Sequence, residues 1–298
     1  MKTFKIGTRA SPLALVQAQM VGDAISSVHP DLEGCIEIVP MTTTGDTIQD
    51  RTLVELGGKA LFTKEIEEAL LQNHVDIAIH SLKDMPYALP SELIIGAVLK
   101  RDDPRDAFIS RSGKKLKDLS AGTKVGTASL RRQAQLLHHY PHLEIVPIRG
   151  NIETRLKKLE NSDIEGLLLA VAGLDRLALS SRITEIMPAD IMIPAVGQGV
   201  IAIECRQQDE HTLQLVQAVN HPETWQAMLA ERSFMRVIEG SCRTPLGAYA
   251  EIHEDLLTVC GFVASEDGKV LEKERVQGLR SQAQSLGEEL GARLKRKV

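Results

Sequence analysis

Five arginines stand where a strand-like apolar run gives way to the start of a helix: Arg9, Arg131, Arg132, Arg149 and Arg155. The chain carries a formal net charge of −5 at pH 7, so it does not attract anions as a whole and these cations must act locally. A planar guanidinium can bind a carboxylate through two parallel hydrogen bonds. The arginines therefore predict a composite anion site for a small polyacid.

A carboxylate lies among these cations. Asp84 follows directly on the apolar run 75–80, with Lys83 beside it. In a cationic pocket an ionised carboxylate can stabilise developing positive charge or accept a proton. Taken alone, this segment is equally consistent with a loop carboxylate that caps a turn. Lys83 is either a further anion ligand or a salt-bridge partner.

The four cysteines stand singly, without the CxxC spacing of a zinc or redox site: Cys35, Cys205, Cys242 and Cys260. We therefore expect neither a disulfide framework nor a metal. Cys242 lies in the loop 240–247, which has no apolar periodicity, and Arg243 beside it favours the thiolate. An ordinary loop cysteine is the alternative. The other three lie in apolar runs and are expected to pack as small hydrophobic residues.

Four polar residues precede expected helices: Ser11, Thr127, Ser129 and Asn151. They could cap the helices, or help the free N–H groups of the first turn to hold carboxylates, and the two roles are compatible.

The segment 57–64 (GGKALFTK) has a composition suited to a flap over an anionic ligand, with Lys59 and Phe62 as its contacts. An ordinary capped loop is the alternative. The spacing of a phosphate-binding loop is absent, so nucleotide binding is not expected.

The elements that must position these residues alternate between strand and helix. The periodicity predicts strands at 3–7, 75–80, 123–126, 144–148 and 166–171. It also predicts a helix that begins at Pro12, a helix at 130–139 and a helix that follows the cap Asn151 and runs through Leu159. Such alternation implies an α/β fold with parallel sheets. Ligands collect outside the carboxyl ends of parallel strands, where the arginines, the serines and Asp84 are expected.

The pattern breaks at 101–105 and again at 193–199. We interpret these segments as two crossings between the same pair of lobes, with the strand 200–205 returning to the first lobe. The predicted domains are 1–99 with 200–219, then 100–199, and a C-terminal α+β domain at 220–298.

The composition excludes some classes of function. Aromatic residues make up 3% of the chain, which argues against stacking platforms for nucleic acid. The N-terminus has no signal peptide and no segment is long and apolar enough to span a bilayer, so we expect a cytoplasmic protein. Nothing demands more than a monomer.

Nine ordered segments resemble the porphobilinogen deaminase (hydroxymethylbilane synthase) family across nearly the whole chain. They are GTRASPLA at 7–14, GGKALF at 57–62, HSLKDMP at 80–86, DPRDA at 103–107, GTASLRRQ at 126–133, RGN at 149–151, AVAGLDRL at 170–177, PAVGQG at 194–199 and GSCRTPLG at 240–247.

The resemblance implies an α/β fold with two lobes like those of type II periplasmic binding proteins, plus a small C-terminal α+β domain that carries a dipyrromethane cofactor. It also implies a transferase of tetrapyrrole and haem biosynthesis, which condenses four porphobilinogen molecules with loss of ammonia and releases hydroxymethylbilane.

The resemblance assigns roles to particular residues. Asp84 is the catalytic carboxylate, and Cys242 forms the covalent thioether to the cofactor. The other cofactor ligands are Ser81, Lys83, Ser129, Arg131 and Arg132, and the substrate ligands are Arg9, Ser11, Arg149, Arg155 and Arg176. The competing hypothesis is a non-catalytic two-lobed anion-binding protein, which leaves Cys242, Asp84 and the C-terminal domain unexplained.

Overall fold

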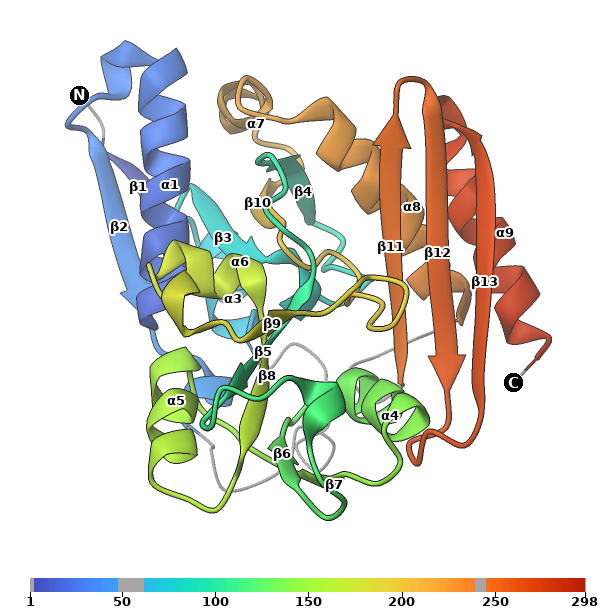
Figure 1. The fold of residues 1–298 in the computed structure, drawn as a ribbon. Coiled ribbons are helices and arrows are strands. Elements are labelled where there is room, and N and C mark those ends of the chain that lie inside the picture. Colours follow the sequence, from blue (N-terminus) through green and yellow to red (C-terminus); the bar gives the residue numbers. More distant parts are fainter. Residues whose placement is uncertain (1–2, 48–61, 239–244, 298) are drawn as a thin grey trace. The chain divides into compact units, whose positions relative to one another are not determined.

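The computed structural model describes residues 3–47, 62–238 and 245–297, which form two compact units (Figure 1). The first contains the described residues of Met1–Ile48, Lys59–Asp102 and Val200–Trp225. The second contains those of Asp103–Gly199 and Gln226–Val298. Between these ranges the chain passes from the first unit to the second at Asp103 and returns at Val200.

The first unit is built on a five-stranded sheet of order β2-β1-β3-β10-β4. Its strands are β1 (Phe4–Arg9), β2 (Ile36–Met41), β3 (Ile77–Ser81), β4 (Leu93–Val98) and β10 (Ile201–Arg206). Its helices are α1 (Pro12–Val28), α2 (Thr44–Thr47), α3 (Lys64–Leu71) and α7 (Glu210–Gln217), with 3-10 turns η1 (Pro30–Leu32) and η2 (Leu82–Asp84). β1 is parallel to β2 and β3, whereas β10 is antiparallel to β3 and β4.

Helices cover both faces of this sheet because successive strand side chains point to opposite sides. Ile77 and Ile79 of β3 belong to the same buried cluster as residues of α1 and α7. Ala78, between them, packs with Ile66 and Leu70 of α3. The next even-numbered position, His80, therefore lies on the α3 face.

The second unit contains a sheet of the same design, in the order β7-β6-β8-β5-β9. Its strands are β5 (Asp106–Ser110), β6 (Lys124–Gly126), β7 (Glu144–Val146), β8 (Gly166–Ala170) and β9 (Glu185–Ile186). Its helices are α4 (Leu130–His139), α5 (Ile152–Glu160) and α6 (Val171–Arg176), with 3-10 turns η3 (Leu116–Asp118) and η4 (Ser180–Arg182). Phe108 packs with Leu136 of α4 on one face, and Leu167 packs with Leu156 of α5 on the other.

The C-terminal part of the second unit is an antiparallel sheet backed by helices. β11 (Leu246–His253), β12 (Leu256–Ala264) and β13 (Leu271–Leu279) are packed by α8 (Pro222–Ile238) and α9 (Ala283–Lys295), which follows η5 (Arg280–Gln282) (Figure 1). This confirms the α+β character of the C-terminal part. It clusters with the second lobe in one unit, so a separate domain from residue 220 stays a prediction.

Two sequence-based expectations were wrong in detail. The sheets are mixed rather than parallel, because β5 and β10, the strands that directly follow the two crossings, run antiparallel to their neighbours. The strand expected to reach residue 148 ends at Val146, since Pro147 has no N–H for the ladder. Among the helices that the structure describes, none has the length and hydropathy to cross a membrane.

Candidate functional site

Arg9 is the last residue of β1, and an acid and an aromatic ring of its own unit hold its guanidinium. Arg9 Nε donates to Asp46 Oδ2 at 3.2 Å, its Nη2 pairs with Oδ1, and Arg9 Cζ lies 4.3 Å from the ring centroid of Phe62. Burial raises the pKa of Asp46, but hydrogen bonds from Arg9 and Thr43 produce a net lowering. The Arg9 side chain is still 24% exposed, so an anion can reach it.

Ser11 stands at the N-cap of α1 with an extended backbone, yet its side chain makes no capping hydrogen bond. The first N–H groups of a 17-residue helix lack partners within the helix. A hydroxyl beside these N–H groups suits a bound carboxylate.

Ser81, Lys83 and Asp84 follow one another at the end of β3. Ser81 Oγ accepts from the amide of buried Gln17 at 2.9 Å, and Lys83 and Asp84 are exposed in η2. β1 and β3 are parallel neighbours, so their carboxyl ends lie at one edge of the sheet. The structure therefore brings Arg9 and Asp84 to the same edge, as the topology predicted.

The start of α4 is shaped by two hydroxyls. Thr127 Oγ1 accepts from Ser129 N at 3.2 Å, and Ser129 Oγ caps the helix by accepting from Arg132 N at 3.4 Å. Asn151 caps α5 in the same way, accepting from Thr154 N at 2.8 Å. Of the four candidate caps, Ser129 and Asn151 are thus confirmed, whereas Ser11 makes no capping bond and Thr127 is not the N-cap of α4.

Arg131 and Arg132 share one buried carboxylate, that of Asp106 at the start of β5. Arg131 Nη2 lies 2.7 Å from Asp106 Oδ2, and Arg132 Nε and Nη2 donate to Oδ1 at 3.0 and 2.7 Å. Gln198 Nε2 also donates to Oδ1 at 3.0 Å. The acid is fully buried, and each arginine side chain is 6% exposed.

Asp106 stays ionised despite its burial. Desolvation raises the pKa of Asp106, but Arg131, Arg132 and the hydrogen bond from Gln198 lower it to about 2. Two guanidinium ions and one carboxylate leave about one net positive charge at the N-terminal turn of α4, where the helix dipole adds to it. Since each guanidinium has five N–H groups and the two also donate to Ile193 O and Leu168 O, part of their donor capacity is already used.

Three further arginines follow β7 and β8 in the chain: Arg149 in the turn after β7, Arg155 in α5 and Arg176 at the end of α6. Arg155 Nε donates to Gly150 O at 2.7 Å, and Arg176 Nη2 donates to Gly199 O at 2.7 Å. All three side chains are half-buried. Gly150 has a φ of +117°, a conformation that glycine adopts without strain, and so forms the turn between Arg149 and the cap of α5.

The structure gathers the predicted residues in two groups, one in each unit. The group in the first unit is Arg9, Ser11, Ser81, Lys83 and Asp84, and that in the second is Ser129, Arg131, Arg132, Arg149, Arg155 and Arg176. Both groups lie around the carboxyl ends of parallel strands. Lys59 and Cys242 lie outside the described residues, so the flap and the thioether remain predictions.

Sequence reasoning missed Asp46, Asp106 and Gln198. Asp106 carried a usable signal, since an acid that opens the apolar run 106–109 is expected to need a buried cationic partner. Asp46 lies in the short helix α2 and Gln198 in a turn, and no local pattern in either segment indicates their partners. Of the other cysteines, Cys205 is buried in β10 and Cys260 half-buried in β12, but Cys35 lies in a turn rather than in an apolar strand.

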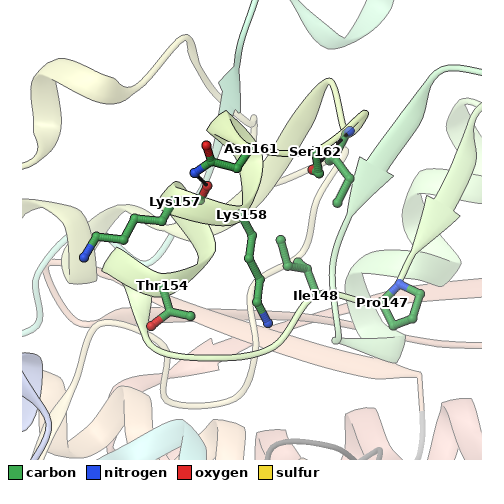
Figure 2. Close-up of a pocket in the computed structure, with 8 residues that line it drawn as sticks. Pro147, Ile148, Thr154, Lys157, Lys158, Asn161 and Ser162 are labelled. Atoms are coloured by element: carbon green, nitrogen blue, oxygen red, sulfur yellow. Dashed lines mark hydrogen bonds between the residues drawn. The ribbon is translucent and has the colours of Figure 1, made fainter.

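A separate open groove of about 390 Å³ runs along α5 (Figure 2). It is lined by Pro147, Ile148, Thr154, Lys157, Lys158, Asn161, Ser162 and Ile164. Lys158 Nζ donates to Arg149 O at 3.0 Å, which ties this lysine to the turn before the helix. None of the predicted site residues lines the groove, so it is not the candidate site.

These observations define the class of protein: a two-lobed α/β protein with a C-terminal α+β part, whose strand ends present arginines and hydroxyls suited to a compound with several carboxylates. Residues 4–214 match the family described as "Porphobilinogen deaminase, dipyromethane cofactor binding domain", and residues 225–296 match "Porphobilinogen deaminase, C-terminal domain". The chain belongs to the porphobilinogen deaminase family.

Individual relatives agree. The porphobilinogen deaminase of Syntrophotalea carbinolica is 47% identical over 291 residues, covering 98% of this chain and 92% of that protein. The porphobilinogen deaminase of Alkaliphilus metalliredigens is 45% identical over 294 residues, with 99% and 92% covered. Among solved structures, substrate-binding domain 2 of GlnP from Lactococcus lactis matches with a TM-score of 0.42 and 11% identity, covering 79% of this chain and 90% of that one.

Proposed function

We propose that this chain joins four porphobilinogen molecules into the linear tetrapyrrole hydroxymethylbilane, with release of ammonia, on a dipyrromethane primer attached to Cys242. The observation that carries the proposal is the exposed carboxylate of Asp84 at the same sheet edge as Arg9. A binding protein for polyacids needs the cations but has no use for this carboxylate. The family membership also favours the enzyme over the non-catalytic alternative.

The residues of the second unit fit a dipyrromethane, whose two rings carry carboxylate side chains. The N-terminal turn of α4 combines the capping Ser129 with Arg131 and Arg132, whose charge exceeds that of Asp106. We assign these three residues, with Ser81 and Lys83, to the cofactor. When bound, the dipyrromethane supplies the pyrrole carbon to which the first substrate is joined.

The remaining arginines and Ser11 serve the substrate. Arg9, Arg149, Arg155 and Arg176 are partly exposed cations at the end of β1 and in the segments that follow β7 and β8, and each can bind an acetate or propionate group bidentately. Such anchoring orients a porphobilinogen molecule so that its aminomethyl group faces the growing end. Lys59 and Phe62 are proposed to close over it as a flap.

Asp84 acts on the substrate ring. Loss of ammonia leaves positive charge on the substrate, delocalised to its pyrrole nitrogen. An ionised carboxylate that accepts the pyrrole N–H hydrogen bond stabilises this charge, and it can take the proton released when the new bond forms. The carboxylate must therefore be exposed to the substrate and held at a defined position.

The intact mass of the denatured chain tests the proposal, because only a covalent adduct survives denaturation. We expect an increment of two linked pyrroles in the wild type and none in Cys242→Ser. Asp84→Glu should turn over slowly, and Asp84→Ala should be inactive while still carrying the adduct. A wild type that remains unmodified after incubation with porphobilinogen would refute the proposal.

We further propose a cytoplasmic monomer without nucleic-acid or membrane partners. The support is the low aromatic content and the ordinary charge balance of the chain. We also propose the division into three domains, with boundaries at residues 100, 200 and 220.

A further inference from the structure

A buried group of ionisable residues lies in the first unit on the α3 face of the sheet. His80 Nε2 and Glu204 Oε2 are 2.9 Å apart, and the two residues are 5% and 0% exposed. Glu67 of α3 is 6% exposed, and Thr63 precedes the same helix at 1%. None of these four residues belongs to the site described above.

Burial of this cluster has an unfavourable free energy, because its polar groups lose their contact with water. Burial raises the pKa of Glu67 and the charge of Glu204 reinforces the rise, whereas the nearby Thr63 and the charge of His80 oppose it. Thr63 Oγ1, Glu67 Oε1 and Glu204 Oε1 have no hydrogen-bond partner among the described residues. Apolar side chains of similar volume would hold this part of the sheet at least as stably. A hydrogen-bonded pair fixes the orientation of its two side chains relative to each other, which apolar packing does not do.

The pair lies at the base of the turn that carries Asp84. β3 and β10 are antiparallel, with His80 opposite Ala202 and Ala78 opposite Glu204, so the His80–Glu204 contact crosses the two strands diagonally. The next backbone contact, a hydrogen bond from Leu82 N to Val200 O at 3.0 Å, lies two residues before Asp84.

The opposite face is also anchored, because Ser81 bonds to Gln17 of α1. The end of β3 is therefore held from both sides, and Asp84 is four residues beyond His80.

We propose that His80 and Glu204 are positioning residues, which fix the end of β3 so that the Asp84 carboxylate meets the substrate at the productive position. The inference rests on the proposed catalytic role of Asp84. Misplacement of a reacting group by about 1 Å can reduce a rate by roughly 100-fold. Loss of the pair should therefore lower kcat by about 10- to 100-fold and leave KM within about twofold, since the arginines that bind substrate are untouched.

Two variants separate positioning from stability. His80→Phe leaves Glu204 buried without its partner and should lower both Tm and kcat. His80→Phe combined with Glu204→Leu removes both polar groups, so Tm should recover while kcat stays low. The conservative variant His80→Gln keeps a donor towards Glu204 and should regain part of the lost kcat. Val216→Ala, in the apolar cluster on the other face, is the control: it should lower Tm with kcat unchanged at a temperature where it is folded.

The measurements are kcat and KM of cofactor-loaded enzyme, with loading verified by intact mass. If the apolar double variant recovers kcat together with Tm, the pair is only structural and the inference is wrong. If His80→Phe does not fold, the double variant and His80→Gln still decide the matter.

Failure of the wild type to consume porphobilinogen, or full activity of Asp84→Ala, would instead refute the proposed function.

Discussion

Asp106→Asn is the substitution for which the structure makes the strongest prediction. The side chain keeps its shape, but it loses the charge that Arg131 and Arg132 share inside the second unit. Both guanidinium groups then remain buried without a counter-ion. In the sequence, the sign of this role is that an acid opens the apolar run 106–109.

The magnitude follows from two considerations. The pKa of Asp106 falls from 3.8 to about 2, which corresponds to about 2 kcal/mol of net stabilisation of the ionised form after its desolvation. Removing one partner of a buried ion pair also leaves the other charge uncompensated, and such changes cost about 3–5 kcal/mol. We therefore expect Asp106→Asn to lower the free energy of unfolding by about 3–5 kcal/mol.

Urea unfolding at pH 7, followed by circular dichroism, measures this change. Asp103→Asn is the matched control, because Asp103 also pairs with an arginine, Arg105, but at the surface, and should cost at most about 1 kcal/mol. Asp106→Asn combined with Arg132→Met should cost less than the sum of the two single changes. If Asp106→Asn costs no more than the control, the buried triad does not stabilise the fold and the reasoning fails.

Further predictions concern protonation, helix caps and a thiol. The lowered pKa of Asp106 means that its stabilising effect is complete above about pH 3.8 and is lost as the pH falls through about 2. The free energies of unfolding of wild type and Asp106→Asn should therefore converge as the pH is lowered over that range. Parallel curves would contradict this. Ser129→Ala and Asn151→Ala should each lower the free energy of unfolding by about 1 kcal/mol in urea melts, because each removes a capping hydrogen bond. Ser11→Ala loses no capping bond and should leave stability unchanged while it raises KM. A loss of stability in Ser11→Ala as large as in Ser129→Ala would be inconsistent with the structure. Burial raises the pKa of Cys205 to about 12, so mass spectrometry after treatment with a thiol reagent at pH 8 should find Cys205 unmodified in the folded protein and labelled only after denaturation.

Much of the site was predictable because its residues are placed by local pattern. The helix expected at 130–139 is α4 to the residue, and the caps Ser129 and Asn151 lie where the polar residues precede apolar periodicity. In alternating strands and helices, the residue after a strand falls at the sheet edge whatever the rest of the chain does. The positions of Arg9 and Asp84 followed from this rule.

The antiparallel strands could not be predicted in this way. β5 and β10 have the same apolar composition as parallel strands, and their direction depends on where the chain re-enters each sheet after a crossing. That choice is made by contacts between segments far apart in sequence, such as Ala202 with His80.

By itself, the sequence determined the family, the lobes and the edge of each sheet at which the arginines, Ser11 and Asp84 lie, because these depend on local periodicity and on motifs. Only the tertiary structure decided how those charges are balanced. Arg132 meets Asp106 across 26 residues and His80 meets Glu204 across 124. An ionic interaction depends on distance and on the local dielectric, and neither quantity exists until the chain has folded.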